Sequence, residues 1–196
     1  IASAPRTAPA VGSHSTRSAG RPRPPRRGPR GRGPPRHRAG GPVARARGPL
    51  RDSDRPGMPT AALDALAAAV IADAGATPSF LGYEGYPASL CVSVNDEVVH
   101  GIPGPRELRP GDVVSVDCGA VVDGWHGDSA VSFVLGEGDP QDEALVEATR
   151  RAMWAGIAAL ATSERRCDVG AAIEDSVRVS GESDGVTYGI VEDYVG

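Results

Sequence analysis

Asp117 and Asp128 are the two side chains whose type and spacing best fit metal chemistry in this sequence. Two carboxylates held close together repel each other, and one of them takes up a proton unless a cation neutralises the pair. One carboxylate can bridge two divalent ions about 3.5–4 Å apart while the other holds one of them. The alternative is a pair of solvated aspartates on an exposed face, because acidic side chains are mostly exposed.

A β-hairpin is the element that would bring these aspartates together. Glycine-bounded runs rich in β-branched residues lie on both sides of Asp123-Gly124, a dipeptide that tolerates the positive φ angles of a two-residue type I′ turn. That turn places Gly119 opposite Asp128. Both carboxylates then lie on one face of the hairpin as diagonal neighbours, about 7–8 Å apart at Cα.

The other face of the predicted hairpin carries apolar side chains. Because side chains alternate along a strand, this face holds Val114, Val116, Val131 and Phe133. We therefore expect it to be buried under a helix. The sequence predicts helices near residues 60–75, with Thr60 as N-cap and Gly75 at the end, and from Asp139 to about residue 160.

Further elements are predicted on either side of the hairpin. A third helix is expected at about residues 169–179, with Ile173 and Val177 facing inward, and the second helix carries an apolar stripe that includes Leu145, Met153, Ile157 and Leu160. Residues 90–99 predict a pair of strands with a turn at Asn95-Asp96, and residues 185–196 predict a strand.

Two longer stretches support a family resemblance. They read FLGYEGYPASLCVSVNDEVVHGIPG and LRPGDVVSVDCGAVVDGWHGDSAVSFVLG. From about residue 50 to residue 196 the chain resembles type I methionine aminopeptidases. The resemblance implies an α+β, pita-bread fold in which two pseudo-symmetric halves enclose the metals, with this chain forming the first half and the start of the second.

The resemblance also implies roles for the polar residues of the site. Asp117 would chelate one metal ion, and Asp128 would bridge two. His100, within His-Gly-Ile-Pro, would contact the substrate near the scissile bond and act as the catalytic histidine; a neutral imidazole can transfer protons near neutral pH. The remaining family ligands would follow residue 196, so we expect the chain alone to lack useful aminopeptidase activity.

The pocket for the substrate side chain is implied by the same resemblance. Tyr83, Tyr86 and Cys91 would line it, and a thioether suits aromatic edges and soft sulfur. Glu84 stands between the tyrosines where the resemblance leads us to expect histidine, which changes the polarity of the rim. His126 lies on the carboxylate face, but the family does not use it as a ligand.

The implied function is removal of the initiator methionine from nascent proteins by attack of a metal-activated water. The cofactors would be two divalent ions, Co, Mn, Fe or Zn, because Asp and His sites accept each of these metals. The implied partners are nascent polypeptides that begin with Met, and the ribosome. We expect a cytoplasmic protein that does not enter membranes and is a monomer at full length.

Two alternatives remain open at this point. The first is another peptidase of the same fold, similar to aminopeptidase P or prolidase, although these differ between the tyrosines and the histidine. The second is a pita-bread domain that has lost catalysis and serves as a binding module. Downstream coding sequence for His-Gly-Ile-Gly would favour a truncated enzyme, and a stop codon after Gly196 would favour the binding module.

The first fifty residues differ from the rest in composition. Although the net charge is −4, all 25 acidic residues lie at or after Asp52, whereas most arginines precede it. Few large apolar side chains are present, so we expect residues 1–50 to be disordered and residues 51–196 to form the incomplete catalytic domain. The family resemblance implies an amphipathic helix in this region, which we do not expect this composition to form.

Three interpretations of the first fifty residues compete. The arginines would give a nucleic-acid-binding arm affinity for phosphate. Pro22-Arg23-Pro24-Pro25 fits a proline-rich ligand. The third interpretation, which we favour, is a GC-rich gene read in the wrong frame, because Arg, Pro, Ala and Gly dominate the segment.

The cysteines predict a reduced protein. Cys91, Cys118 and Cys167 are odd in number and widely spaced, which does not fit a disulfide framework or a zinc finger. No apolar run approaches the roughly 18 residues that a membrane span needs.

Overall fold

The predicted hairpin is the centre of the fold. In the computed structural model, which describes residues 38–46 and 55–190, strands β3 (Val113–Val122) and β4 (Trp125–Val134) pair antiparallel. Asp123 and Gly124 form the loop with φ angles of 52° and 80°. Positive φ at both positions is the signature of a type I′ turn, whose twist matches that of the strands it joins.

The register of the hairpin is the predicted one. Gly119 pairs with Asp128, and Asp117 pairs with Ala130. Directly opposed residues share a face, so Asp117 and Asp128 lie on the same face of the sheet. The prediction of a shared carboxylate face is therefore confirmed.

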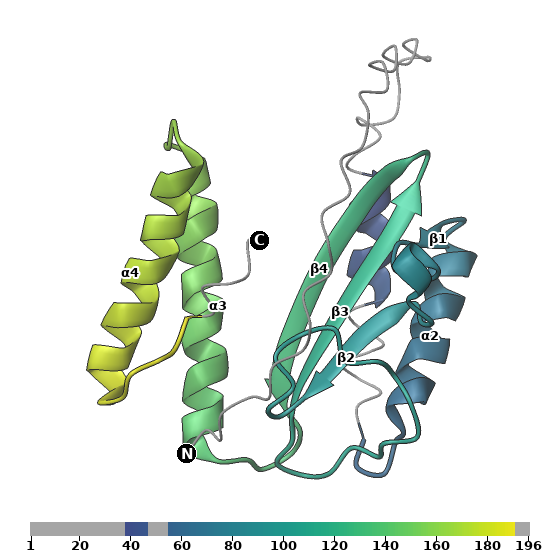
Figure 1. Cartoon of the computed structure of the whole chain (residues 1–196), viewed down its shortest axis with the longest axis horizontal. Helices are drawn as coiled ribbons and strands as arrows, with labels where there is room; N and C mark the ends of the chain where they lie inside the picture. Colours follow the sequence, from purple (N-terminus) through teal and green to yellow (C-terminus); the bar gives the residue numbers. More distant parts are fainter. Residues whose placement is uncertain (1–37, 47–54, 191–196) are drawn as a thin grey trace, which may run out of the picture. The chain divides into compact units, whose positions relative to one another are not determined.

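Two shorter strands occupy the other edge of β3 (Figure 1). β2 (Leu90–Val94) and β1 (Thr77–Pro78) both pair antiparallel with β3. In this register Cys91 lies opposite Asp117, and Ser93 lies opposite Ser115. Cys91 and Ser93 thus lie on the carboxylate face, whereas their neighbours on β2 point to the core.

The core face of the sheet is covered by α2 (Thr60–Asp73), as the hairpin pattern predicts (Figure 1). Val114 and Val116 are fully buried there, and Val131 and Phe133 are partly buried against the same cluster. Spacing of three or four residues along α2 brings its buried side chains to one stripe, which consists of Leu63, Ala67 and Ile71.

The predicted C-terminal end of α2 is confirmed, but its predicted N-cap is wrong. Gly75, with φ of 68°, follows the helix and donates its N–H to the Ala72 carbonyl, as expected for a terminating glycine. At the start, Pro59 is the N-cap and Thr60 is the first helical residue. The Thr60 hydroxyl instead bonds both the N–H and the carbonyl of Gly104, so it ties the helix to a loop.

Residues 38–46 correct the expectation of disorder across the first fifty residues. They form a helix, and Ala39, Val43 and Ala46 are buried against the fold. These positions, with buried Pro42, follow the i, i+3, i+4, i+7 spacing of an amphipathic helix. Composition averaged over fifty residues concealed this short stripe; residues 1–37 and 47–54 lie outside the described residues.

Gly127 should control the docking of this helix. A Cβ at Gly127 would lie 2.5 Å from the backbone carbonyl carbon of Ala39, which is too close for any real contact. We expect Gly127→Ala to detach residues 38–46, with their amides exchanging about tenfold faster or more in hydrogen exchange because a helix this short is marginal without packing. Unchanged protection would show that the helix does not depend on this contact. Ser129→Ala, on the same face of β4, is the control.

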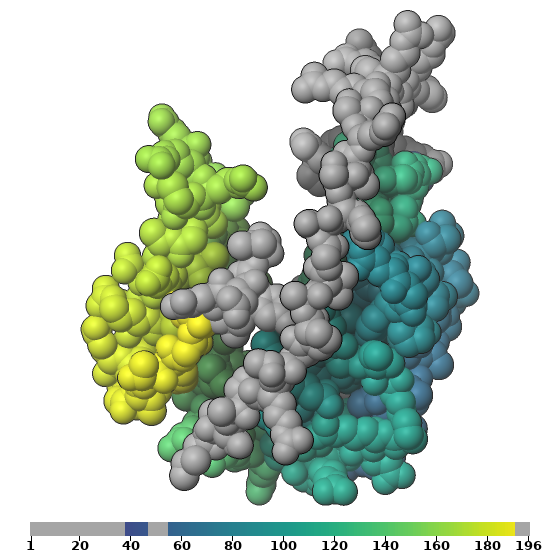
Figure 2. Space-filling model, viewed as in Figure 1, coloured from purple at the N-terminus to yellow at the C-terminus, as the bar shows by residue number. Residues whose placement is uncertain are grey.

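The two C-terminal helices pack against each other. α3 (Pro140–Leu160) begins as predicted, with Asp139 accepting a hydrogen bond from the Gln141 N–H and Pro140 in the first turn. α4 (Arg166–Asp184) is longer than predicted at both ends. Gly156 allows their close approach, because a Cβ there would lie 2.8 Å from the side chain of Ile173. Figure 2 shows the surfaces of the two helices in direct contact.

Part of the apolar stripe of α3 is exposed. Small residues, Ala148, Ala152 and Gly156, are buried. Four larger members of the stripe are exposed in the described part of the chain: Leu145, Met153, Ile157 and Leu160. On α4, Ile173 packs over Gly156 although it remains partly exposed, whereas Val177 is half-buried.

Two strand predictions are wrong. Residues 90–99 form one strand and a loop instead of a pair, because the free edge of β2 is satisfied otherwise: the Val92 N–H donates to the Gly101 carbonyl and the Val94 N–H to Glu97. Residues 185–190 have no strand, and residues 191–196 lie outside the described residues.

Across the described ranges, no helix combines the length and apolar character needed to cross a membrane.

Candidate functional site

The two aspartates occupy different environments on the carboxylate face of the hairpin. Asp117, in the middle of β3 between two other strands, is half-buried, whereas Asp128 on β4 is exposed. The small residue Gly119, which lies opposite Asp128, leaves room for the ring of Phe80. The sheet therefore presents one shielded and one accessible carboxylate side by side.

Burial raises the pKa of Asp117 to about 6, and the charge and hydrogen bonding of Asp128 add to the increase. A hydrogen bond with the Cys118 backbone and the nearby His100 act in the opposite direction. Without a cation, the second negative charge is thus unfavourable in this position. The electrostatics favour a bound positive charge between the two aspartates.

All six residues that the sequence analysis assigns to the site line one cavity. Its volume is about 580 Å³, and it is open to solvent. The lining includes the following predicted site residues: Tyr83, Tyr86, Cys91, His100, Asp117 and Asp128. Residues from two loops and three strands therefore converge on the carboxylate pair, although they are separated by up to 45 positions in the sequence.

His100 reaches the cavity from the loop that follows β2. This residue has a φ of 59°, an uncommon left-handed conformation for a side chain other than glycine. Its side chain is exposed and lies on the cavity wall. His126, in contrast, bonds the Ser79 hydroxyl through Nδ1 at 3.1 Å, and it is not among the residues that line this cavity.

Tyr86 and Cys91 form the inner wall of the cavity. The Tyr86 hydroxyl contacts the carbonyl oxygens of Leu90 at 2.9 Å and Gly101 at 3.1 Å. Burial raises the pKa of Tyr86, and a hydrogen bond with Cys91 raises it further. Tyr83 is exposed at the rim, where the short 3₁₀ turn η1 (Tyr83–Gly85) holds it.

Sequence reasoning did not assign five further lining residues, of which Gly85 and Pro87 belong to the same loop as the tyrosines. Phe80 is one of them. Gly119 could have indicated it, because a glycine inside a strand often marks the close approach of another group, and here the Phe80 ring lies against Gly119. Ile102 is another, two residues after His100 in the same motif. Glu84, noted only as a departure from the family pattern, places a third carboxylate on the wall.

The carboxylate pair fits a divalent cation in chemistry but supplies few ligands. Oxygen donors suit hard divalent ions, and a cation would relieve the repulsion that raises the pKa of Asp117. Within the residues that the structure describes, no group of three or more His, Cys, Asp or Glu side chains could hold a metal ion. Asp117 and Asp128 are the neighbouring carboxylates on the sheet that could share such an ion in this part of the chain.

Comparisons with known proteins identify the family of this chain. Residues 37–195 match Metallopeptidase family M24. The chain belongs to this family. It is also 53% identical over 159 residues to methionine aminopeptidase 1 of Mycobacterium tuberculosis, covering 81% of this chain and 60% of that protein. The family match begins at residue 37, so it includes the helix at residues 38–46.

The family resemblance extends to other bacteria. Methionine aminopeptidase 1 of Bacillus subtilis is 39% identical over 158 residues, which are 81% of this chain and 61% of the relative. The crystal structure of the methionine aminopeptidase from Thermotoga maritima superposes with a TM-score of 0.71 at 36% identity, covering 75% of this chain and 59% of that one. The resemblance to type I methionine aminopeptidases and the pita-bread fold are confirmed. This M24 chain spans about 60% of the length of these relatives.

The cysteines of this M24 chain should differ in reactivity. Burial raises the pKa of the Cys91 and Cys118 thiols, that of Cys118 to about 12, whereas Cys167 is exposed on α4. Because the thiolate is the reactive form, a raised pKa keeps the first two thiols protonated and unreactive at pH 7.5. We expect iodoacetamide to label Cys167 first in the folded chain and all three cysteines in urea. Labelling is located by peptide mass spectrometry. Early labelling of Cys118 would contradict the buried position of its thiol.

Proposed function

We propose that this chain provides the substrate pocket and two of the metal ligands of an aminopeptidase that removes the N-terminal methionine from proteins. The observation that carries the proposal is the convergence of Asp117, Asp128 and His100 on a cavity walled by Tyr86 and Cys91. The 53% identity to a methionine aminopeptidase across most of this chain supports the same reaction.

The cofactors in this proposal are two divalent ions, drawn from Co, Mn, Fe or Zn. Bound divalent ions supply a nucleophilic water at neutral pH and polarise the carbonyl of the scissile amide. Asp117, the shielded carboxylate, would hold one ion. Asp128, the accessible one, would bridge both. The position of Asp117 between two strands fixes its carboxylate on the cavity wall before any ligand arrives.

The pocket suits the side chain and amide of an N-terminal methionine. The rings of Phe80 and Tyr86 and the Cys91 sulfur offer the thioether an apolar, polarisable wall. His100, on the same wall, would contact the substrate near the scissile bond and transfer a proton there. Tyr83 at the exposed rim would contact the substrate as it enters.

The proposed substrates are nascent polypeptides that begin with Met followed by a small residue. A cavity of about 580 Å³ accommodates one methionine side chain with room for the flanking amide. The proposed setting is the cytoplasm, close to the ribosome, with the full-length protein acting as a monomer. The same cavity in a domain without catalysis would bind such peptides without cleaving them.

A chimera tests the function without reference to where this chain ends. Residues 37–195 would replace the matching part of the M. tuberculosis enzyme, and release of Met from Met-Ala-Ser would be measured with Mn²⁺. We expect turnover that Asp117→Asn and Asp128→Asn each abolish. A folded chimera that binds Mn²⁺ and Met-Ala-Ser but does not cleave would instead support a binding module. The 196-residue chain, assayed in parallel, should show no measurable turnover because its described residues hold no group of three or more metal-ligating side chains.

A further inference from the structure

His100 depends on its neighbour Gly101 for its place in the cavity. The left-handed backbone of His100 is unfavourable relative to the usual regions, so surrounding contacts must hold it. Gly101 follows directly, and a Cβ at Gly101 would collide with the Val92 carbonyl oxygen. The backbone of Gly101 thus lies directly against β2.

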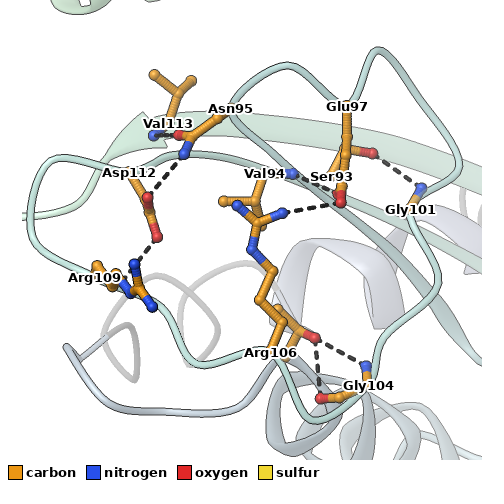
Figure 3. Close-up of polar contacts among 11 residues, drawn as sticks. Ser93, Val94, Asn95, Glu97, Gly101, Gly104, Arg106, Arg109, Asp112 and Val113 are labelled. Carbon is orange, nitrogen blue, oxygen red and sulfur yellow. Dashed lines mark hydrogen bonds and ion pairs between the residues drawn. The ribbon is translucent and has the colours of Figure 1, made fainter.

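Gly101 is held by both of its backbone polar groups. Its carbonyl accepts from the Val92 N–H at 2.9 Å and contacts the Tyr86 hydroxyl at 3.1 Å. Its N–H donates to the Ser93 hydroxyl oxygen at 3.1 Å, as Figure 3 shows. Two of the three partners belong to β2, so this strand holds Gly101, the residue after His100, in place.

Ser93 is a buried hydroxyl on the carboxylate face of the sheet. Its exposed fraction is 5%. In the register of the sheet it lies opposite Ser115, which in turn lies opposite Ser132, so three serines form a row across three strands. Ser115 and Ser132 bond each other at 2.7 Å. The hydroxyl of Ser93 instead accepts from the loop, which makes this serine different from the two beside it.

The remaining polar contacts secure the ends of the loop (Figure 3). Glu97 accepts from the Val94 N–H and from Arg106, each at 2.9 Å, and Asn95 donates to Asp112 at 2.9 Å. The ion pair of Glu97 and Arg106 is exposed, and exposed pairs of this kind contribute little. Two side chains therefore bond Gly101, the residue adjacent to His100: the half-buried Tyr86 at its carbonyl and the buried Ser93 at its N–H.

We propose that Ser93 is the positioning residue of His100, fixing the imidazole on the cavity wall through the Gly101 N–H. This inference deepens the proposed function and rests on it for the role of His100. Loss of the Ser93 hydroxyl would leave the Gly101 N–H without its partner. The loop would then leave the left-handed conformation at His100, and the imidazole would move away from the carboxylates.

The test uses nuclear magnetic resonance on the full chain, with Ser93→Ala compared with Ser115→Ala. Both variants remove one hydroxyl from the same row, but the hydroxyl of Ser115 bonds Ser132, whereas that of Ser93 accepts from Gly101 in the loop. We expect the Gly101 amide to exchange about tenfold faster in Ser93→Ala, as for loss of one hydrogen bond. The His100 ring signals, assigned with His100→Gln, should move in Ser93→Ala and stay in place in Ser115→Ala. Ser93→Thr retains the hydroxyl acceptor, so both the slow exchange of the Gly101 amide and the original His100 ring signals should be retained.

Mn²⁺ separates this inference from the proposed function. Added Mn²⁺ should broaden the signals of Asp117, Asp128 and the His100 ring, and Ser93→Ala should reduce the broadening of the ring alone. Mn²⁺ that leaves both aspartates unchanged would refute the metal site, while a displaced His100 in Ser93→Ala would still support the inference. His100 signals that are equal in the two alanine variants would overturn it. So would a Gly101 amide that exchanges without protection in the unaltered chain, a measurement that needs no variant.

Discussion

The Asp128→Asn chain should lose Mn²⁺ binding at the hairpin. Replacing the carboxylate by a carboxamide of the same size removes half of the negative charge that the pair offers, and we expect the affinity for Mn²⁺ to fall on the order of 100-fold or more. The same change removes the repulsion that helps to raise the pKa of Asp117, so we expect the variant to fold. Binding is measured by the paramagnetic relaxation of water or by titration calorimetry.

The hairpin offers a matched control for this measurement. Asp123→Asn makes the same chemical change at the tip of the same hairpin, where Asp123 pairs with Arg38 and is not among the cavity-lining residues. Asn-Gly is as suitable for a type I′ turn as Asp-Gly, so the fold should be retained. Equal loss of Mn²⁺ affinity in both variants would mean that the metal responds to net charge and not to the site.

Leu63→Ala should cause a large loss of stability. Leu63 is fully buried between α2 and the sheet, within the cluster that includes Val114 and Val116. Truncating such a side chain removes its transfer free energy and leaves a cavity, which typically costs about 2–5 kcal/mol. We expect a corresponding decrease in the free energy of unfolding, measured by urea titration with circular dichroism.

Leu66 allows the same truncation to be made on the same helix at a less buried position. Leu66 is partly buried at the margin of the cluster, so Leu66→Ala should reduce the free energy of unfolding by clearly less than Leu63→Ala. Equal effects of the two substitutions would indicate that helix propensity or residual structure, and not burial under the sheet, determines the loss.

The elements that could be predicted from sequence are those with local and redundant signals. Asp123-Gly124 between two alternating apolar runs specified the turn, and a two-residue loop leaves only one register. Asp139-Pro140 likewise specified the start of α3. From the hairpin alone, the shared face of Asp117 and Asp128 followed without knowledge of the rest of the fold.

The elements that could not be predicted depend on partners distant in sequence. Residues 38–46 form a helix despite Gly40, Gly41 and Pro42, because their small buried side chains pack on the fold and not because of intrinsic propensity. Residues 97–99 appeared strand-like, but the edge of β2 that they would have paired with is occupied by Gly101 and the Glu97 side chain.

Six of the residues that line the cavity could be predicted from the sequence, but their arrangement could not. The resemblance named Tyr86 and His100, and both line the cavity. No local pattern indicates that the Tyr86 hydroxyl contacts the Gly101 carbonyl, or that the Ser93 hydroxyl accepts from the Gly101 N–H. Such contacts arise when the loop after β2 folds back onto that strand and onto Tyr86, and their partners are too far apart in sequence to form a local pattern.

The short turn between β3 and β4 has a consequence for the order in which the protein assembles. Hairpins of this kind form in about 1–10 μs, because little chain must be closed before the first contacts are made. Pairing of β2 with β3 joins residues 20 or more positions apart, such as Val94 and Val114, so we expect it to follow formation of the hairpin. During folding, the two carboxylates therefore meet first on an isolated ribbon that is still hydrated, and their repulsion grows only as the later elements exclude water from Asp117. A cation bound between the two aspartates would offset that repulsion during these later steps.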